Sequence, residues 1–407
     1  MNDRDLLDRD LMREVERDSM RDIIRGGFGR QIGFRTATAP SAGAKRPPHP
    51  FLSMRPYYKF AGRVPNTAWG GVEQFLQLKQ EAFCGGLLIR VGGQYDIAVS
   101  GAMNARAGYA AIAKFKINPP GGAQPWNIDG WNTKMFNLVD VDFDPFTRGI
   151  DIEGVTPTLI NGVGRNTTTD ELFPNAIAAG QLYQLWYFIP FHRSAYDLRG
   201  LLPVGTDDPY QLGVTPGAIA DVFVTPGNVT NATMTVDVWQ LIYERPVAGS
   251  LKLDQRWLYV TEERVNPAGP LAVGEYEVII PKRESIVTDF LTTVILNNAL
   301  DSVDVSVLTL EIDGYFFHNA FDRRAWDRIV RGFLGKTPPL GVIYYPWDRM
   351  KSADGAIAQF DSYYALSMSE WIDTTDVSTL SHRFTITGGV AGVSQARTAI
   401  RRLTRVQ

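Results

Sequence analysis

The chain has 407 residues, of which 44% are hydrophobic and 21% are charged, and its formal net charge is −3. This composition is typical of a globular protein with enough chain for two domains, and it lacks the excess positive charge of a general nucleic-acid-binding protein. The single cysteine, Cys84, excludes a framework of disulfides within the chain, and the four histidines leave few ligands for a Cys/His metal site. Residues 1–25 lack the apolar segment of a signal peptide, and no stretch approaches the roughly 18 apolar residues of a membrane-spanning helix.

Residues 3–25 are predicted to form one charged, exposed helix, because good helix formers dominate and no glycine or proline occurs before Gly26. Its acids precede arginines by three residues, a spacing that stabilises helices through side-chain ion pairs. Two interpretations stay open, a solvated helix or a helix that docks on a partner subunit or a membrane surface. Residues 26–50 are rich in Gly, Ala and Pro and are interpreted as an extended arm.

Further along the chain, the pattern changes to short runs rich in Val, Ile, Tyr, Phe and Thr, separated by Gly, Pro, Asn and Asp. The clearest predicted strands are residues 86–91, 95–100, 136–143, 181–189, 232–243, 276–280, 285–296, 303–312, 341–345 and 383–387. A few inserted helices are predicted, chiefly at residues 322–333, where apolar residues recur at helical spacing. Many short strands without βα alternation predict an all-β fold of two tandem β-sandwiches.

Three short segments of the first half are echoed in the same order in the second half. Residues 150–154 (IDIEG) resemble residues 310–314 (LEIDG), residues 189–193 (IPFHR) resemble residues 345–349 (YPWDR), and residues 234–236 (MTV) resemble residues 384–386 (FTI). The offset between the paired segments shrinks slowly along the chain, as expected when the second copy has shorter loops. We therefore predict that one sandwich is duplicated, with the boundary near residues 246–250.

The candidate catalytic and ligand-binding motifs are incomplete. Residues 332–337 (GFLGKT) imitate the end of a phosphate-binding loop, but Val330 stands where its first glycine is required. Asp140, Asp142 and Asp144 alternate as in a calcium loop, but a proline follows where glycine is required. No G-x-S-x-G elbow is present. A pair of glycosidase carboxylates stays an open alternative, because acidic residues are plentiful and their pairing depends on the three-dimensional structure. We predict no catalytic residue, no metal or cofactor site and no enzymatic activity.

Two groups of side chains are candidates for binding a partner. The first group combines aromatic and basic residues: Trp186, Tyr187, Phe188, Phe191 and Tyr196 with His192, Arg193 and Arg199. These residues form either an exposed platform on which sugars or bases stack or a strand of the sandwich core. The second group is a short basic C-terminal tail that carries Arg397, Arg401, Arg402 and Arg405. This tail either is solvated or contacts an anionic surface such as DNA or lipid.

A charged N-terminal helix and arm, two similar sandwiches, no catalytic signature and a basic C-terminal stretch together resemble the double jelly-roll major capsid proteins of tailless icosahedral viruses, of the bacteriophage type. The resemblance covers the whole chain in size and layout. It implies two eight-stranded jelly rolls per subunit and a trimer with a pseudo-hexameric outline. It also implies that the strands leading to Pro190 and Pro346 are equivalent, and that residues 101–135 and 194–230 are loops of the first jelly roll.

The expected domains are the helix and arm (residues 1–50), a first jelly roll (51–248), a second jelly roll (249–392) and a basic tail (393–407). The expected function is that of a major capsid protein in the virion, assembled in the host cytoplasm, without cofactor or small-molecule substrate. The expected partners are further copies in a homotrimer, neighbouring capsomers and minor capsid proteins. An internal membrane or the genome is a further expected partner, through the N-terminal helix and Arg397, Arg401, Arg402 and Arg405. The main alternative is a carbohydrate- or receptor-binding sandwich protein such as a viral spike or fibre.

Overall fold

The computed structural model describes the following residues of the chain: 56–81, 83–97, 107–119, 124–139, 150–152, 181–192, 200–204, 209–243, 257–265, 271–281, 285–296, 299–300, 304–334, 338–339, 341–346, 372–374, 377, 379–390 and 394–405. The predicted N-terminal helix and arm lie outside these residues, as does the predicted boundary at 246–250. The position of that boundary therefore stays a prediction.

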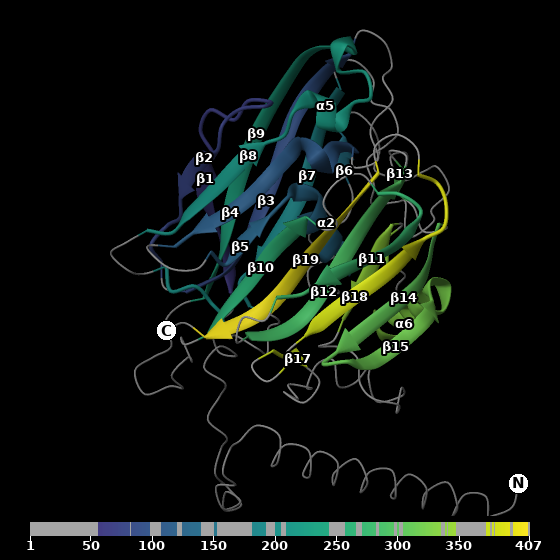
Figure 1. The fold of residues 1–407 in the computed structure, drawn as a ribbon. Helices are drawn as coiled ribbons and strands as arrows, with labels where there is room; N and C mark the ends of the chain where they lie inside the picture. Colours follow the sequence, from purple (N-terminus) through teal and green to yellow (C-terminus); the bar gives the residue numbers. More distant parts are fainter. Residues whose placement is uncertain are drawn as a thin grey trace, which may run out of the picture.

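The strands β1 to β9 form two sheets that pack face to face, which we call the first sandwich (Figure 1). One sheet has the order β1-β9-β3-β7-β6, and the other contains β2-β8-β4-β5. Phe115 and Tyr187, from opposite sheets, meet with ring centroids 5.1 Å apart. The strands are β1 (Tyr57–Arg63), β2 (Gln74–Gln77), β3 (Phe83–Ile97), β4 (Ile112–Asn118), β5 (Trp126–Ile128), β6 (Ile150–Ile152), β7 (Gln181–Pro190), β8 (Gln211–Pro216) and β9 (Val229–Tyr243), with the helical segments η1 (Ala107–Ala111), α2 (Gly130–Val139), α5 (Ile219–Val222) and η2 (Pro226–Asn228).

The strands β10 to β19 form the second sandwich, and its sheets contain β13-β12-β19-β10 and β11-β18-β14-β15, with β16 and β17 also paired to β12. The elements are β10 (Trp257–Val265), β11 (Gly274–Ile279), β12 (Ser285–Leu296), β13 (Ala299–Leu300), β14 (Val305–Ile312), β15 (Tyr315–Asp322), α6 (Arg323–Leu334), β16 (Val342–Tyr345), β17 (Ile372–Asp373), β18 (Leu380–Ile386) and β19 (Gln395–Arg405).

The two sandwiches have the same strand order, which is that of a jelly roll. The order β1-β9-β3-β7 in the first sandwich corresponds to β10-β19-β12-β16 in the second, and β2-β8-β4-β5 corresponds to β11-β18-β14-β15. Each sandwich also carries one helix between its fifth and sixth equivalent strands, α2 after β5 and α6 after β15. The predicted fold class of two tandem jelly rolls is confirmed.

Only one of the three sequence echoes joins equivalent strands. Pro190 ends β7 and Pro346 follows β16, and these strands are equivalent as predicted. Residues 150–152 form the additional strand β6, whereas residues 310–312 lie in β14. Residues 234–236 lie in β9, whereas residues 384–386 lie in β18, whose equivalent is β8. The duplication was thus predicted correctly from a partly wrong alignment.

Two local predictions were wrong. The segment predicted as a strand at 136–143 is helical as far as Val139, and residues 140–143 lie outside the described part. Asp129 caps this helix, because its Oδ1 accepts the backbone N–H of Asn132 at 2.6 Å. The predicted loops at 101–135 and 194–230 contain the core strands β4, β5 and β8. Short apolar runs fit a strand or a buried helix equally well, which explains the first error.

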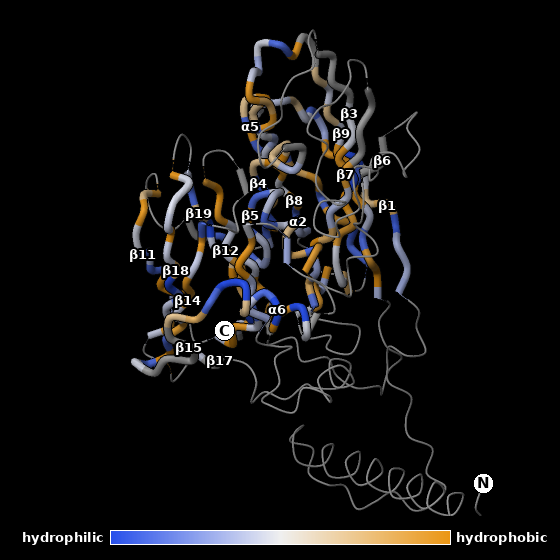
Figure 2. The backbone as a smooth tube through the Cα atoms, turned by 90° about the vertical axis from the view of Figure 1, so that its right-hand side faces the viewer, coloured by the Kyte–Doolittle hydropathy of each residue, from blue (hydrophilic) through white to orange (hydrophobic). Residues whose placement is uncertain are grey.

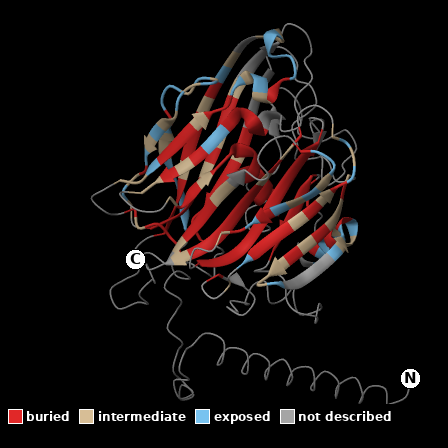
Figure 3. Ribbon diagram, in the orientation of Figure 1, coloured by how far each residue is buried: buried red, intermediate tan, exposed pale blue. Residues whose placement is uncertain are grey.

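Every residue of β12 is buried, whereas five of the seven residues of β1 are exposed (Figure 3). The strand β12 (SIVTDFLTTVIL) is covered on both faces, and its sequence accordingly does not alternate between apolar and polar residues. Figure 2 shows hydrophobic stretches along the inner strands of the first sandwich, near β7 and β9, and largely hydrophilic residues around α6. The strand β12 therefore lies in the interior of the molecule.

Candidate functional site: the junction between the sandwiches

The two sandwiches are joined through their sheets. The short strand β5 pairs in parallel with β10, placing Trp126 opposite Thr261, and the Thr261 N–H donates to the carbonyl oxygen of Pro125 at 2.8 Å. One sheet of the first sandwich thereby continues into one sheet of the second, giving a sheet of ten strands, of which eight follow one path and β16 and β17 pair with β12 beside it. Pairing between strand edges sets both the distance and the register of the two jelly rolls.

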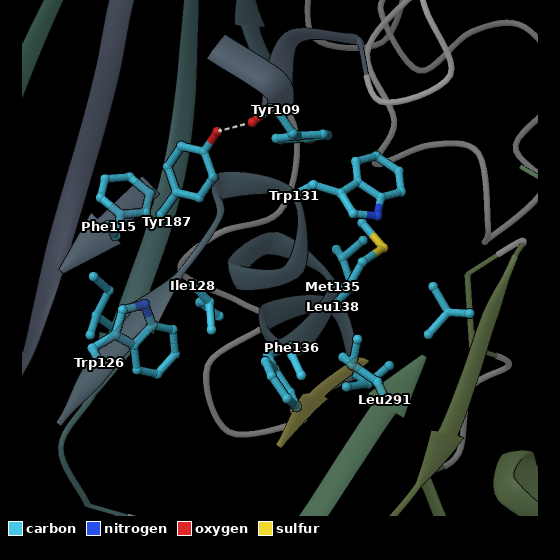
Figure 4. Close-up of a cluster of buried hydrophobic side chains, with 14 of the residues drawn as sticks. Tyr109, Phe115, Trp126, Ile128, Trp131, Met135, Phe136, Leu138, Tyr187 and Leu291 are labelled. Atoms are coloured by element: carbon cyan, nitrogen blue, oxygen red, sulfur yellow. Dashed lines mark hydrogen bonds between the residues drawn. The ribbon is translucent and has the colours of Figure 1, made fainter. Parts of the chain in front are cut away.

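Helix α2 fills the space beside this shared sheet, and all ten of its residues are buried. Figure 4 shows α2 between strands of the first sandwich, which carry Phe115 and Tyr187, and strand β12 of the second, which carries Leu291. The Thr293 hydroxyl of β12 donates to Oδ1 of Asn132 on α2 at 3.0 Å. The helix is therefore shared core of both jelly rolls.

Asn137 ties α2 to the first sandwich. Its Nδ2 donates to the carbonyl oxygen of Phe188 at 2.7 Å, and its Oδ1 accepts the N–H of the same residue at 2.8 Å. Asn137 is 1% exposed, so these two bonds are shielded from water.

Replacing Asn137 by alanine should therefore lower the free energy of unfolding by roughly 1–3 kcal/mol, because two buried backbone groups of β7 lose their partners. Urea unfolding followed by circular dichroism measures this change. Asn118→Ala is the control, since Asn118 is partly exposed and accepts the amide of Gln124 at 3.3 Å. The control should change stability by less than about 0.5 kcal/mol, and equal stability of the two variants would contradict the assigned role of Asn137.

The arginines predicted to form a basic tail instead belong to β19, which lies between β10 and β12 in the second sandwich. Ala399, Ile400 and Leu403 are fully buried there, so the strand is core. Arg401 and Arg402 are 3% and 1% exposed, and so neither contacts DNA or lipid. The prediction of a tail at 393–407 was wrong because strand pairing supplies partners that a count of charges does not reveal.

Each described arginine of β19 has an acidic partner from a distant part of the sequence. Arg397 donates to Asp129, the cap of α2, at 2.9 Å and to Glu263 at 3.3 Å. Arg402 pairs with Glu262 of β10 and also donates to Ser285 at 3.4 Å. The side chain of Arg405 lies outside the described part. These ion pairs bind β19 to both neighbouring strands and to α2.

The Asp289–Arg401 pair is the most deeply buried of these contacts. The Arg401 Nε donates to the two carboxylate oxygens of Asp289 at 2.9 and 3.0 Å, and Asp289 also accepts the Tyr344 hydroxyl at 2.7 Å. The Arg401 guanidinium carbon lies 4.3 Å from the centroid of the Phe136 ring on α2. This stacking of a cation on an aromatic face connects the second sandwich to the helix of the first.

A second ionic cluster lies on the outer face of the first sandwich, where Asp237 of β9 accepts bonds from Arg63 at 2.7 Å and Arg90 at 2.5 Å. Burial alone would raise the pKa of the Asp237 carboxyl, but the hydrogen bonds and charges of the two arginines outweigh burial and hold that pKa below its usual value. Arg90 also lies 5.5 Å from the ring of Trp239 and 5.9 Å from that of Trp186. The cluster combines one carboxylate with two cations.

Most of the predicted aromatic platform is interior. Tyr187, Phe188 and Phe191 are fully buried and Trp186 is partly buried, as the core interpretation predicted. His192 is 2% exposed, and its Nε2 lies 3.2 Å from the Tyr243 hydroxyl. Arg193, Tyr196 and Arg199 lie outside the described residues.

The motifs weighed for chemistry contribute no assembled site to the part of the chain that the structure describes. Gly332 lies near the end of α6, while residues 335–337 and the aspartates at 140, 142 and 144 are outside that part. Among the described residues, no three His, Cys, Asp or Glu side chains are grouped so that they could hold a metal ion. None of the described helices is both long and apolar enough to cross a membrane.

Comparison with known proteins identifies the fold. No protein-family model matches the chain, and no curated protein sequence matches it. The structure resembles the major capsid protein of Sulfolobus Turreted Icosahedral Virus with a TM-score of 0.58 and 11% sequence identity, covering 86% of this chain and 97% of that chain. It resembles the Faustovirus major capsid protein with a TM-score of 0.56 and 8% identity, covering 92% and 93% of the two chains. It also resembles the PBCV-1 virus capsid with a TM-score of 0.51 and 8% sequence identity, covering 86% of this chain and 95% of that chain.

The chain therefore has the double jelly-roll fold of viral major capsid proteins, and the sequence resemblance to that class is confirmed at the level of the fold. The likeness extends over nearly the whole length of the solved structures, so it includes both jelly rolls.

Proposed function

We propose that this chain is a major capsid protein that trimerises into pseudo-hexameric capsomers and builds an icosahedral virion shell. The observation that carries the proposal is the shared double jelly-roll fold, which spans 86–92% of this chain and 93–97% of two major capsid proteins. Two equivalent jelly rolls per chain make six similar units in a trimer, which is the simplest way for three copies to fill a hexagonal outline.

The buried junction supports the same proposal. A capsomer needs the two jelly rolls of each subunit at a constant orientation, and the shared sheet, helix α2 and the ion pairs of β19 all act on that orientation. No chemistry is assigned to these residues, and the proposed role is structural. The partners under this proposal are copies of the chain, neighbouring capsomers and minor capsid proteins, in the virion and during assembly in the host cytoplasm. Contact with a membrane or the genome is assigned to residues 3–25 alone.

The carbohydrate- or receptor-binding alternative is less well supported. It was predicted to use the aromatic platform around residues 186–196, whereas Tyr187, Phe188 and Phe191 are buried in the first sandwich.

Light scattering coupled to size exclusion, together with negative-stain microscopy of the purified full chain, tests the proposal. We expect trimers whose images have a hexagonal outline, and shell-like particles at high concentration. Monomers at every concentration, with binding to sugars, would contradict the proposal and favour the alternative.

A further inference from the structure

The helices α2 and α6 occupy equivalent places in their jelly rolls and are capped in the same way. Asp129 caps α2, and Asp322 caps α6 by accepting the N–H of Ala325 at 2.8 Å. Asn137 of α2 binds the backbone of Phe188, and the indole N–H of Trp326 on α6 donates to the carbonyl oxygen of Tyr344 at 3.0 Å. Phe188 and Tyr344 each precede the equivalent proline by two residues. Both helices are therefore fastened to the same position of their own jelly roll.

The surroundings of the two helices differ. Phe136 and Ile329 each follow the capping aspartate by seven residues, but Phe136 is fully buried under the second sandwich and Ile329 is 37% exposed. Elsewhere on its surface, α6 also exposes three arginines, which are Arg324, Arg328 and Arg331. The face of α2 that contacts the next jelly roll thus corresponds to an open face of α6.

The surface that would complement this face is also present and open. In the second sandwich, Leu291 pairs with Tyr344 and Ala399, and α2 lies over this face. In the first sandwich, Leu88 pairs in the same way with Phe188 and Trp239. Leu291, Ala399 and Tyr344 are fully buried. In the first sandwich Phe188 is fully buried as well, whereas Leu88 and Trp239 are partly exposed.

Aromatic side chains enlarge this open face. Phe60 of β1 is 46% exposed and its ring centroid lies 5.4 Å from that of Trp239, while Tyr58 is 38% exposed. Among the described strands, β1 ends one sheet of the first sandwich, and β15 ends one sheet of the second. These two edges are the equivalents of β10 and β5, which pair with each other in the junction.

We infer that a second copy of this chain docks its helix α6 on the outer face of β1, β9 and β3, so that the contact between copies repeats the contact within the chain. The inference rests on the proposed trimer. The docked pair would place Ile329 of the helix on Trp239 and Phe60. The cations of this face, Arg63 and Arg90, are already paired with Asp237. Such a head-to-tail contact closes into a ring when the rotation between copies is one third of a turn.

Cross-linking tests the geometry. Chains carrying Phe60→Cys and chains carrying Ile329→Cys are co-expressed with different tags and treated with a short bismaleimide. We expect a covalent product that contains both tags, and no product when either variant is expressed alone. Cys84 does not interfere, since it is fully buried and burial raises the pKa of its thiol to about 12.

Ile329→Asp gives an independent readout by light scattering, with Val224→Asp as the matched control because Val224 is 55% exposed beside α5. The Ile329→Asp variant should need a roughly tenfold or higher chain concentration to form trimers, while the control behaves as the unmodified chain. Trimers that tolerate Ile329→Asp and give no mixed product would overturn the docking inference and leave the proposed function standing. Self-linking of Ile329→Cys would also overturn it. Monomeric unmodified chain would overturn both.

Discussion

Replacing Asp289 by alanine is expected to lower the free energy of unfolding by roughly 3–5 kcal/mol, because it leaves the Arg401 guanidinium buried without a counter-charge. The side chains of Asp289 and Arg401 are 0% and 3% exposed, so water cannot take the place of the carboxylate. The Tyr344 and Thr288 hydroxyls lose an acceptor at the same time. Chemical unfolding followed by tryptophan fluorescence measures the change.

Two further variants define the cause of this loss. Glu277→Ala removes a carboxylate that pairs with Arg383 where the two side chains are 41% and 35% exposed, and it should cost less than about 1 kcal/mol. Asp289→Leu combined with Arg401→Met removes both charges and should recover most of the stability lost in Asp289→Ala. If Asp289→Ala lowered the free energy of unfolding no more than Glu277→Ala does, the Asp289–Arg401 ion pair would not stabilise the second sandwich.

Phe136→Ala is expected to cost a similar amount, roughly 3–5 kcal/mol, because it opens a cavity in the shared core. Phe136 is fully buried on α2, and its ring also lies under the Arg401 guanidinium. Since this ring contacts the second sandwich from a helix of the first, its loss should weaken the coupling between the jelly rolls. We expect the unfolding curve to broaden or split into two transitions, which differential scanning calorimetry detects.

Val273→Ala is the control for this cavity, because Val273 is 65% exposed before β11 and should contribute less than about 0.5 kcal/mol. A Phe136→Ala variant that loses stability in a single, equally sharp transition would show that α2 supports one sandwich without coupling the two. An unchanged free energy of unfolding would contradict the burial of Phe136 itself.

Elements whose signal is local were predicted well. The strand predicted at 285–296 has the same bounds as β12, and the helix predicted at 322–333 is α6, displaced by one residue. In both cases a long apolar or periodic run left little choice of structure. The short strand β5 and the helix α2 lacked such a run, and the capping pattern that begins at Asp129 was the one available signal for α2.

The functional junction could not be predicted from the sequence because its contacts join distant residues. Arg401 lies 112 positions from Asp289, and Arg397 lies 268 positions from Asp129. A cluster of arginines near a chain end has the same appearance in a sequence whether it is solvated or paired in a core strand. Likewise, two of the three echoes matched non-equivalent strands, because short strands of similar composition recur throughout a jelly roll.

The sequence by itself determined that the chain is all-β, contains two copies of one sandwich and carries no complete catalytic motif, since these properties follow from local periodicity, turn residues and residue types. Only the tertiary structure decided which strands correspond, that β19 is core instead of tail, and that α2 is buried where its equivalent α6 is open. The reason is physical, because strand order and the pairing of buried charges depend on which distant segments meet, and neither alternation nor composition encodes that choice.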